Sequence, residues 1–157
     1  MKASIDSASL ILMLKVPELI PIVKSYLASI YATDKIYQEV FEAKNSPETI
    51  NFDKQQIFFQ VKNPKKLIQT KLGEGELSAI SLAFEEKIVF LSEDKKAIQF
   101  ARSLGLKHAS ILSILIKAKE DRKVTKEKAK GILFKLVENR FYISSELFSA
   151  VLKRLEK

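Results

Sequence analysis

Short apolar runs alternate with longer amphipathic stretches along most of the chain, and this alternation predicts strands and helices in turn. The clearest strand is Ile88-Val89-Phe90-Leu91, a run of β-branched and aromatic residues that ends abruptly at Ser92-Glu93-Asp94. The run is too short for a helix and is typical of a strand that is buried on both faces. The other expected strands are residues 2–5, 30–32, 57–61 and 106–109.

Segments with helical spacing connect these strands. From Glu76 onward, Leu77, Ile80 and Phe84 recur at intervals of three and four residues, which gives the segment one broad apolar face. A short polar turn, Gly73-Glu74-Gly75, is expected to precede it. Further helices are expected over residues 10–16 with Ser7 or Ser9 as the cap, 17–27, 34–44, 65–70, 95–104, 111–116, 126–137 and 145–155, with one helical turn within 47–56.

This alternation of strand and helix places the chain in the α/β class, with a mostly parallel central sheet. The length of 157 residues is that of one domain, so a single domain over residues 1–157 is expected. From residue 125 to residue 157 the pattern changes to a helical hairpin with apolar stripes. These stripes are expected to pack on the sheet domain, on a second copy of the chain or on a partner protein.

Four acidic residues follow the expected strands or lie in the helices next to them, at the expected carboxyl edge of the sheet. Asp6 follows the first strand, Glu39 lies in the helix after the second, Glu76 opens a later helix, and Asp94 follows the fourth strand. If the strands are parallel neighbours, these acids meet at one edge of the sheet, where open α/β sheets bind their ligands. Taken singly, Glu39 is equally typical of an exposed helix residue, and Glu76 of an acid at a helix N-terminus.

Composition narrows the chemistry of these acids. Like charges 4 Å apart repel by about 4 kcal/mol at an effective dielectric near 20, so converging carboxylates need a compensating cation. The chain has no Cys and one His, which excludes a disulfide framework and a thiolate zinc site and favours the cytoplasm. The expected ion is therefore Mg²⁺ or Mn²⁺, which prefer oxygen ligands. Such ions activate water and stabilise the leaving oxygen in phosphodiester hydrolysis.

The formal net charge of +8 favours a polyanionic partner, although a basic surface that only maintains solubility explains it as well. Lys95, Lys96 and Arg102 follow Asp94 closely and are candidate contacts to nucleic-acid phosphates, or else an exposed helix face. His108 is expected to be structural. The apolar runs are too short to span a bilayer, so no membrane association is expected.

Taken together, the acids and their neighbours resemble the PIN-domain nuclease family. The resemblance rests on Asp6-Ser7 after the first strand, on residues 36–40 around Glu39, on residues 72–76 with the helix that follows, and on residues 91–94 with Ala97. It covers nearly the whole chain. The tail, residues 118–155, is similar to prokaryotic PIN-like proteins that are related to toxin–antitoxin nucleases.

The resemblance implies a three-layer α/β/α fold and a metal-dependent endoribonuclease that acts on single-stranded RNA. The family's metal-binding acids fall on Asp6, Glu39, Glu76 and Asp94. Its polar residue near the last acid falls on Ser92, and Glu76 stands where toxin relatives often have Asp. Glu93 competes with Asp94 for the fourth position, and Asp94 is preferred because two residues separate it from Ala97.

The resemblance also implies the toxin of a toxin–antitoxin pair, with a small antitoxin protein as its partner. The apolar helical hairpin indicates a homodimer or the capture of an antitoxin peptide. The alternative is a catalytically weak or inactive PIN-like fold that only binds nucleic acid or protein. An acid after the first strand also occurs in phosphatases and response receivers. Such phosphatases need a second acid two residues later, where this chain has Ala8, and receivers need paired acids and a late Lys that are not found here.

Overall fold

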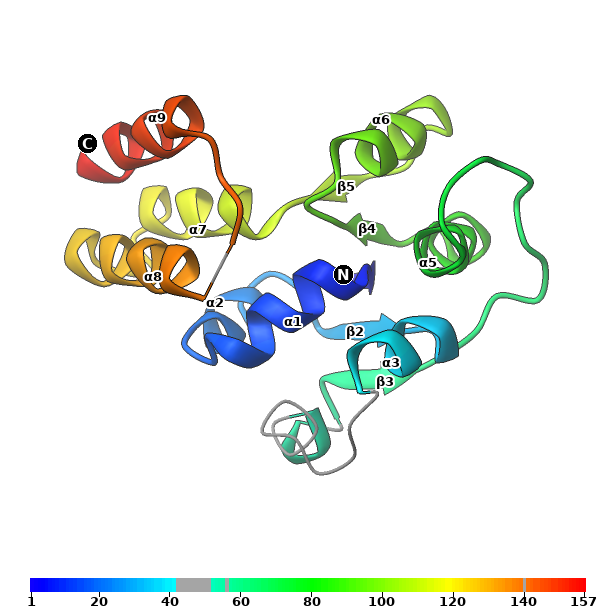
Figure 1. Cartoon of the computed structure of the whole chain (residues 1–157). Helices are drawn as coiled ribbons and strands as arrows, with labels where there is room; N and C mark the ends of the chain where they lie inside the picture. Colours follow the sequence, from blue (N-terminus) through cyan, green and yellow to red (C-terminus); the bar gives the residue numbers. More distant parts are fainter. Residues whose placement is uncertain (42–51, 56, 140) are drawn as a thin grey trace.

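The computed structural model describes residues 1–41, 52–55, 57–139 and 141–157 (Figure 1). Its centre is one sheet of five parallel strands in the order β3-β2-β1-β4-β5. The strands are β1 (Lys2–Ile5), β2 (Ser29–Ala32), β3 (Phe59–Val61), β4 (Val89–Leu91) and β5 (His108–Ala109). The α/β class and the parallel sheet that the sequence predicts are therefore confirmed.

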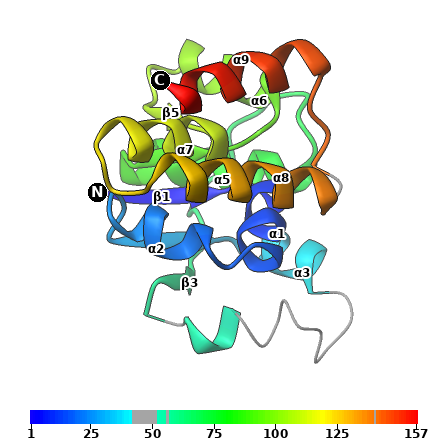
Figure 2. The ribbon, with the colours of Figure 1, turned by 90° about the vertical axis from the view of Figure 1, so that its left-hand side faces the viewer.

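Helices cover both faces of this sheet. They are α1 (Ser7–Lys15), α2 (Leu19–Lys24), α3 (Asp34–Val40), α5 (Glu74–Glu86), α6 (Lys95–Ser103), α7 (Ile111–Glu120), α8 (Lys126–Glu138) and α9 (Ser145–Glu156). Figures 1 and 2 show α1, α2 and α7 on one side of the sheet and α5 and α6 on the other. Helix α3 lies beyond the carboxyl end of β2, where it contacts both α1 and α5. This arrangement confirms the three-layer α/β/α fold.

The register of the central strands places the first residues after β1 and after β4 side by side. Strands β2 and β4 are wholly buried, and β1 is buried after Lys2, as parallel strands covered on both faces should be. Ile5 pairs with Leu91, so the carboxyl ends of β1 and β4 lie level. The backbone N–H of Asp6 donates to the carbonyl of Leu91 at 3.1 Å. The residues that follow these two strands therefore begin as neighbours.

The helix after β1 begins earlier than the sequence predicts. Asp6 is its N-cap, with an extended backbone and a side chain that accepts a hydrogen bond from the backbone N–H of Ser9 at 2.9 Å. The prediction that Ser7 or Ser9 caps this helix is therefore wrong. An acid placed directly after the strand already satisfies a free N–H group of the first turn, so the helix needs no later cap.

The glycine-containing segment before Glu76 is also different from its prediction. Helix α5 begins at Glu74, with Gly73 at the N-cap, so Gly75 lies inside the first turn of the helix. The carbonyl of Gly73 accepts the first helical hydrogen bond, from the N–H of Leu77 at 2.8 Å. The prediction of a polar turn over residues 73–75 is wrong because Glu74 and Gly75 already belong to the first turn of the helix.

The predicted helix over residues 65–70 is absent, and the segment has no regular secondary structure. Its backbone N–H groups bond instead to side chains of α5. Lys65 donates to the Glu85 carboxylate at 2.9 Å, and Ile68 donates to Ser81 Oγ at 2.9 Å. These distant partners replace the carbonyls that a helix would offer.

The predicted helix over residues 34–44 is α3, which ends at Val40 with Phe41 as its C-cap. Residues 42–44 of this prediction lie outside the described residues, as do residues 47–51 and 56 of the predicted single turn. Residues 52–54 are helical. Strands β3 and β5 are shorter than predicted, and α7 continues to Glu120.

The two C-terminal helices form the predicted hairpin, with Thr125 and Ser144 as N-caps. Helix α9 packs against α7 and α8, and α8 packs against α7 (Figure 2). The buried positions of the two helices therefore face the rest of the same chain. They are Ala129, Ile132, Leu133, Leu136, Val151 and Leu155. Within the described ranges, no helix has the length and apolarity that crossing a membrane requires.

Candidate functional site

The carboxyl ends of β1 and β4 hold Asp6 and Ser92 in direct contact. Asp6 is 3% exposed, and its Oδ2 accepts a hydrogen bond from Ser92 Oγ at 2.6 Å. Ser92 Oγ in turn accepts from the backbone N–H of Asp94 at 3.0 Å. Both oxygens of Asp6 thus accept hydrogen bonds, Oδ1 from the backbone N–H of Ser9 in α1 and Oδ2 from Ser92 Oγ. This chain of bonds fixes the position of Asp94 relative to Asp6.

Asp94 is the N-cap of α6. Its Oδ1 accepts from the backbone N–H groups of Lys96 at 2.8 Å and Ala97 at 3.3 Å. Burial opposes the ionisation of Asp94, but the hydrogen bonds from Glu76, Ala97 and Lys96 and the charge of Lys96 outweigh it and lower its pKa. Asp94 is therefore the ionised member of its pair with Glu76.

Glu76 lies in the first turn of α5 and is hydrogen-bonded to Asp94 through the two carboxyl groups. Burial is the largest cause that raises the pKa of Glu76 from 4.5 to about 7. The hydrogen bond to Asp94 and the negative charges of Asp94, Asp6 and Glu39 raise it further. All three of the other predicted acids thus act electrostatically on Glu76.

Glu39 reaches this group from the exposed side of α3. Its carboxylate lies against the first turn of α5, because a Cβ added to Gly75 would be 2.4 Å from Glu39 Oε1 and 2.6 Å from Oε2. Only a glycine at this position permits so close an approach. The N-terminus of α5 carries free N–H groups and the positive end of the helix dipole, which favour a carboxylate there.

Two hydroxyl groups align α3 with α5. Thr33, the N-cap of α3, and Ser78 of α5 are hydrogen-bonded through their hydroxyl oxygens at 2.6 Å. Ser78 also donates to the carbonyl of Gly75 at 2.8 Å. These buried bonds place the α3 side chains beside the first turn of α5. The sequence predicts neither this clamp nor the role of Gly75, although a glycine one residue before Glu76 is a signal of close approach.

Glu93 is engaged elsewhere. Its Oε1 accepts a hydrogen bond from the backbone N–H of Ile111, at the N-terminus of α7. Burial raises the pKa of Glu93 to about 8, a rise that the bond to Ile111 reduces and the charge of Asp6 increases. Of the two adjacent acids, Asp94 is thus the one that pairs with Glu76, whereas Glu93 connects the end of β4 to α7.

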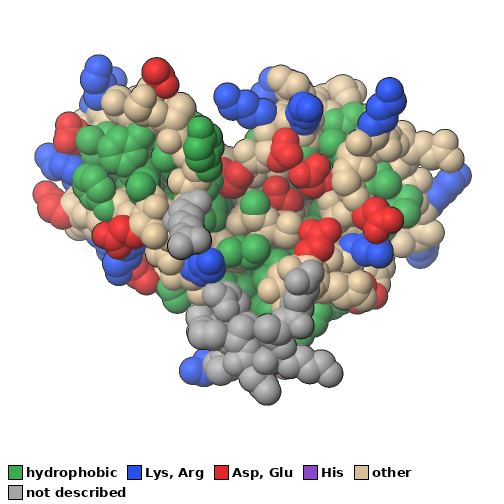
Figure 3. Space-filling model, viewed as in Figure 1, with side chains coloured by type: hydrophobic (Ala, Val, Ile, Leu, Met, Phe, Trp, Pro, Cys, Tyr) green, Lys and Arg blue, Asp and Glu red, His purple; other side chains and the backbone are tan. Residues whose placement is uncertain are grey.

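Basic side chains surround the acids without neutralising them. Figure 3 shows acidic side chains gathered in the hollowed centre of the face at the carboxyl ends of the strands, with Lys and Arg near its rim. Lys95, Lys96 and Arg102 are exposed on α6. Within the part of the chain that the structure describes, none of the three forms an ion pair. They remain available for an anionic ligand.

The donor set fits a hard divalent cation, since all four converging acids supply oxygen. Among the described residues, no group of three or more His, Cys, Asp and Glu side chains is arranged to hold a metal ion as it stands. Instead, the pKa of Glu76 is raised and that of Asp94 is lowered, so Glu76 is the member of the pair that binds a proton more tightly. Burial of Glu76 and then the negative charges of Asp94, Asp6 and Glu39 raise this pKa, and the same negative charge attracts a cation.

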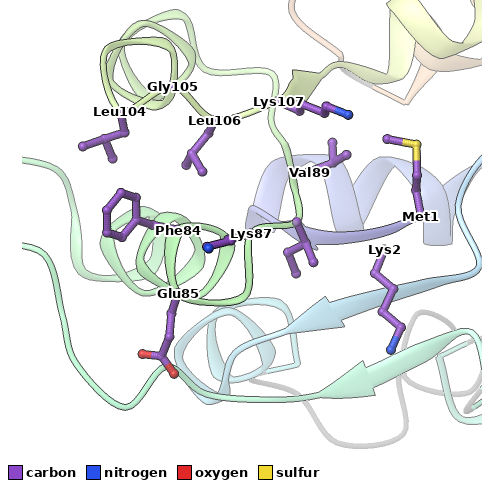
Figure 4. Close-up of a pocket in the computed structure, with 11 residues that line it drawn as sticks. Met1, Lys2, Phe84, Glu85, Lys87, Val89, Leu104, Gly105, Leu106 and Lys107 are labelled. Carbon is purple, nitrogen blue, oxygen red and sulfur yellow. The ribbon is translucent and has the colours of Figure 1, made fainter.

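Another hollow, of about 820 Å³, lies at the opposite edge of the sheet (Figure 4). It is lined by Phe84 of α5, Val89 at the start of β4, and Leu106. Glu85 is its single acidic residue, and the walls are largely apolar. His108 lines a different cavity, of about 560 Å³. The convergent carboxylates, rather than either of these cavities, therefore mark the candidate site.

Comparisons with known proteins agree with this fold. The family DUF3368, described as a PIN domain, matches residues 3–157. Among solved structures, the chain is similar to a PilT N-terminus domain protein, SSO1118, from the hyperthermophilic archaeon Sulfolobus solfataricus P2. That likeness has a TM-score of 0.55 and 22% identity, and it covers 75% of this chain and 93% of the other. No curated protein shows significant similarity to the chain. The chain belongs to the PIN-domain family.

Proposed function

We infer that this PIN-domain protein is an endoribonuclease that cleaves single-stranded RNA with the help of Mg²⁺ or Mn²⁺. One observation carries the inference: Glu76 shares a hydrogen bond with Asp94 while the charges of Asp6 and Glu39 also act on it. Four acids from four separate parts of the chain thus concentrate negative charge at one edge of the sheet. PIN domains are generally nucleases, and such carboxylates are the ligands of their divalent ions.

In this proposal Asp6, Glu39, Glu76 and Asp94 hold the metal. A bound ion supplies an activated water and stabilises the leaving oxygen of the phosphodiester. Asp6 and Asp94 are the fixed ligands, because backbone N–H groups and Ser92 already orient them. Ser92 is a positioning residue. Glu76 would hold the ion as a carboxylate, so its raised pKa would make metal affinity depend on pH near neutrality.

The basic residues of α6 hold the substrate. Lys95 and Lys96 lie in the first turn of the helix that Asp94 caps, so they are close to the metal ligands along the chain. Arg102 lies in the last turn of the same helix. Their positive charges attract the phosphates on either side of the cleaved bond. Glu93 supports the site by keeping the N-terminus of α7 at the end of β4.

The role of a toxin, with a small antitoxin partner and a homodimer in the cytoplasm, belongs to the same proposal. Its support is an apolar surface on the C-terminal helices, where Phe134, Val137 and Leu147 remain exposed.

A second candidate function is a PIN-fold module that binds RNA or protein without cleavage. What favours it is that the described acids are not arranged to hold an ion as they stand.

The test is cleavage of a labelled single-stranded RNA in Mn²⁺, in Mg²⁺ and in EDTA. The variants are Asp6→Asn and Asp94→Asn, because Asn retains the oxygen that caps each helix and removes the charge. We expect metal-dependent cleavage that falls by at least about 100-fold in each variant, since even outer residues of metal sites cost 10–100-fold.

The matched control is Asp53→Asn, which removes an exposed acid away from the four carboxylates and should cleave like the wild type. Cleavage that is equal in all the proteins would refute the proposed site. RNA that binds equally with and without metal and is never cut would favour the binding module.

A further inference from the structure

A groove of about 740 Å³ runs along α7 and begins beside the residues that flank Asp94 in the sequence. One of its ends is formed by Glu93 and Lys95, the neighbours of Asp94, and the other by Glu120 and Arg154. Figure 3 shows a notch next to the acidic hollow, between α6 and the lobe that contains α7, α8 and α9. The groove thus connects the proposed site of cleavage with the far end of α7.

The wall opposite α7 offers an aromatic side chain that is almost fully exposed. Tyr142 lines the groove, in the segment that leads into α9, and is 94% exposed. A large aromatic ring left so exposed is a ready surface on which a nucleobase can stack. Leu112 and Ile116 of α7 make the floor apolar, so the groove favours flat, weakly hydrated groups between its two polar ends.

At its far end the groove meets a strongly basic pocket of about 780 Å³ at the turn between α7 and α8, with Glu120 and Arg154 lining both. Glu120 is the one acid of the basic pocket and is paired with Arg154 at 2.6 Å. The N-terminus of α8, capped by Thr125, adds the positive end of a helix dipole. The basic residues of the pocket are Lys119, Arg122, Lys123, Lys126, Arg154 and Lys157.

Most of this positive charge is uncompensated. Lys123 lies over the ring of Tyr26 at 3.7 Å and donates to the carbonyl of Ser25. For Lys119, Arg122, Lys126 and Lys157, no acidic partner is found within the described ranges 1–41, 52–55, 57–139 and 141–157. Such a pocket attracts a polyanion and repels a basic peptide.

The spacing of the two ends suits a nucleic-acid strand. Helix α7 has ten residues, which span about 15 Å at a rise of 1.5 Å per residue. Its N-terminus bonds to Glu93 beside the acids, and its C-terminus forms one wall of the basic pocket. At 3.4 Å per stacked nucleotide, this distance corresponds to about four nucleotides.

We propose that the groove is the track for the RNA strand that flanks the cleaved bond, with Tyr142 stacking on a base and the basic pocket holding phosphates. The proposal rests on the proposed function for the nature of the strand. A single strand supplies both features that the groove recognises, a phosphate at each nucleotide and bases that stack. A protein segment lacks this regular negative charge.

The first test uses the absence of tryptophan from the chain, since Tyr142→Trp introduces a single tryptophan. In EDTA, we expect an oligouridylate of about 12 nucleotides, within the range of single-strand site sizes, to quench its fluorescence. Tyr142→Ala should weaken binding by about 5- to 150-fold, the equivalent of about 1–3 kcal/mol for one stacked base, whereas Tyr142→Phe should bind like the wild type.

The second test removes charge from the basic pocket. Arg122→Gln combined with Lys126→Gln should lower the slope of log affinity against log salt by about 1.4, because each phosphate contact to a single strand contributes about 0.7. This equals a roughly 25-fold loss of affinity at 0.1 M salt relative to 1 M. The matched control is Lys15→Gln with Lys153→Gln, which neutralises two exposed lysines outside the groove and should leave the slope unchanged.

The outcomes separate this proposal from the nuclease proposal. RNA that quenches the tryptophan but is never cleaved in Mn²⁺ would support the groove and refute the nuclease. RNA that is cleaved without quenching, and with the same salt slope in both double variants, would overturn the groove and leave the nuclease standing. Quenching by an unrelated acidic peptide, but not by RNA, would also overturn the groove as an RNA track.

Discussion

Replacement of Glu76 by Gln should stabilise the metal-free protein above neutral pH. The pKa of Glu76 is raised from 4.5 to about 7, by burial first and then by its contact with Asp94 and the charges of Asp94, Asp6 and Glu39. The folded state therefore binds this proton more tightly than the unfolded chain. Its stability falls as the pH rises from about 4.5 through about 7, because the carboxylate that forms there is buried among other acids.

The Glu76→Gln variant avoids this penalty because the new side chain carries no charge, and its amide can donate to Asp94 as the protonated acid does. The rise of the pKa from 4.5 to about 7, at 1.36 kcal/mol for each tenfold change, sets an upper bound of about 3 kcal/mol. Glu76 is only partly buried, and water screens its charge, so we discount the gain to about 1 kcal/mol. In a chain of this length, that energy corresponds to about 2–4 °C in Tm.

The assay is thermal unfolding in EDTA at pH 5 and pH 8. The Tm of the wild type should fall over this range by more than that of Glu76→Gln, and the variant should be the more stable protein at pH 8. The lowered pKa of Asp94 does not compete, because the stability that it provides is lost only as the pH falls through the acidic range below its usual value of 3.8. Glu146→Gln, an exposed change in α9, is the control. A Glu76→Gln protein that is less stable than the wild type at pH 8 would refute this electrostatic reasoning.

Three further predictions concern Gly75, Ser92 and the pair Gly105 and Gly131. Gly75→Ala should weaken Mn²⁺ binding by about 10- to 100-fold in calorimetry, since its Cβ would lie 2.4 Å from an oxygen of Glu39 and must displace that carboxylate. Ser92→Ala should cost about 1–3 kcal/mol in urea unfolding, because the buried carboxylate that it supports loses a donor. Gly105→Ala should destabilise by about 1 kcal/mol, since φ is +73° there, whereas Gly131→Ala in α8 should stabilise by about 0.5–1 kcal/mol.

Each of these three predictions has an outcome that contradicts it. Unchanged Mn²⁺ affinity in Gly75→Ala would mean that displacing the Glu39 carboxylate from its place beside α5 does not affect metal binding. A neutral Ser92→Ala would mean that water replaces the lost hydroxyl. If Gly105→Ala and Gly131→Ala shift the urea midpoint in the same direction, backbone conformation does not control stability at these two positions.

The fold could be predicted from the sequence where burial alone decides the structure. Strand β4 is a continuous apolar run because helices cover both of its faces, and its abrupt polar end at Ser92 marks the edge of the sheet. The parallel order of the strands then brings Asp6 and Asp94 together, as the sequence predicts. Strands of this kind are set by the local pattern of apolar and polar residues, so they can be predicted without knowledge of distant contacts.

The details that the sequence does not reveal depend on partners far along the chain. Residues 65–70 remain without helical structure because side chains of α5, Glu85 and Ser81, satisfy their N–H groups. The role of Glu93 also depends on a distant partner, because its carboxylate accepts a hydrogen bond from the N-terminus of α7. Gly75 is a similar case, because its lack of a side chain makes room for the Glu39 carboxylate from α3.

The central claim is that the converging carboxylates form a site for a divalent cation. Its most direct test is Mn²⁺ binding followed by electron paramagnetic resonance, in the wild type, Asp6→Asn, Asp94→Asn and the control Asp53→Asn. We predict saturable Mn²⁺ binding to the wild type and to Asp53→Asn, and its loss from the other two variants. Equal Mn²⁺ binding by all four proteins would contradict the claim.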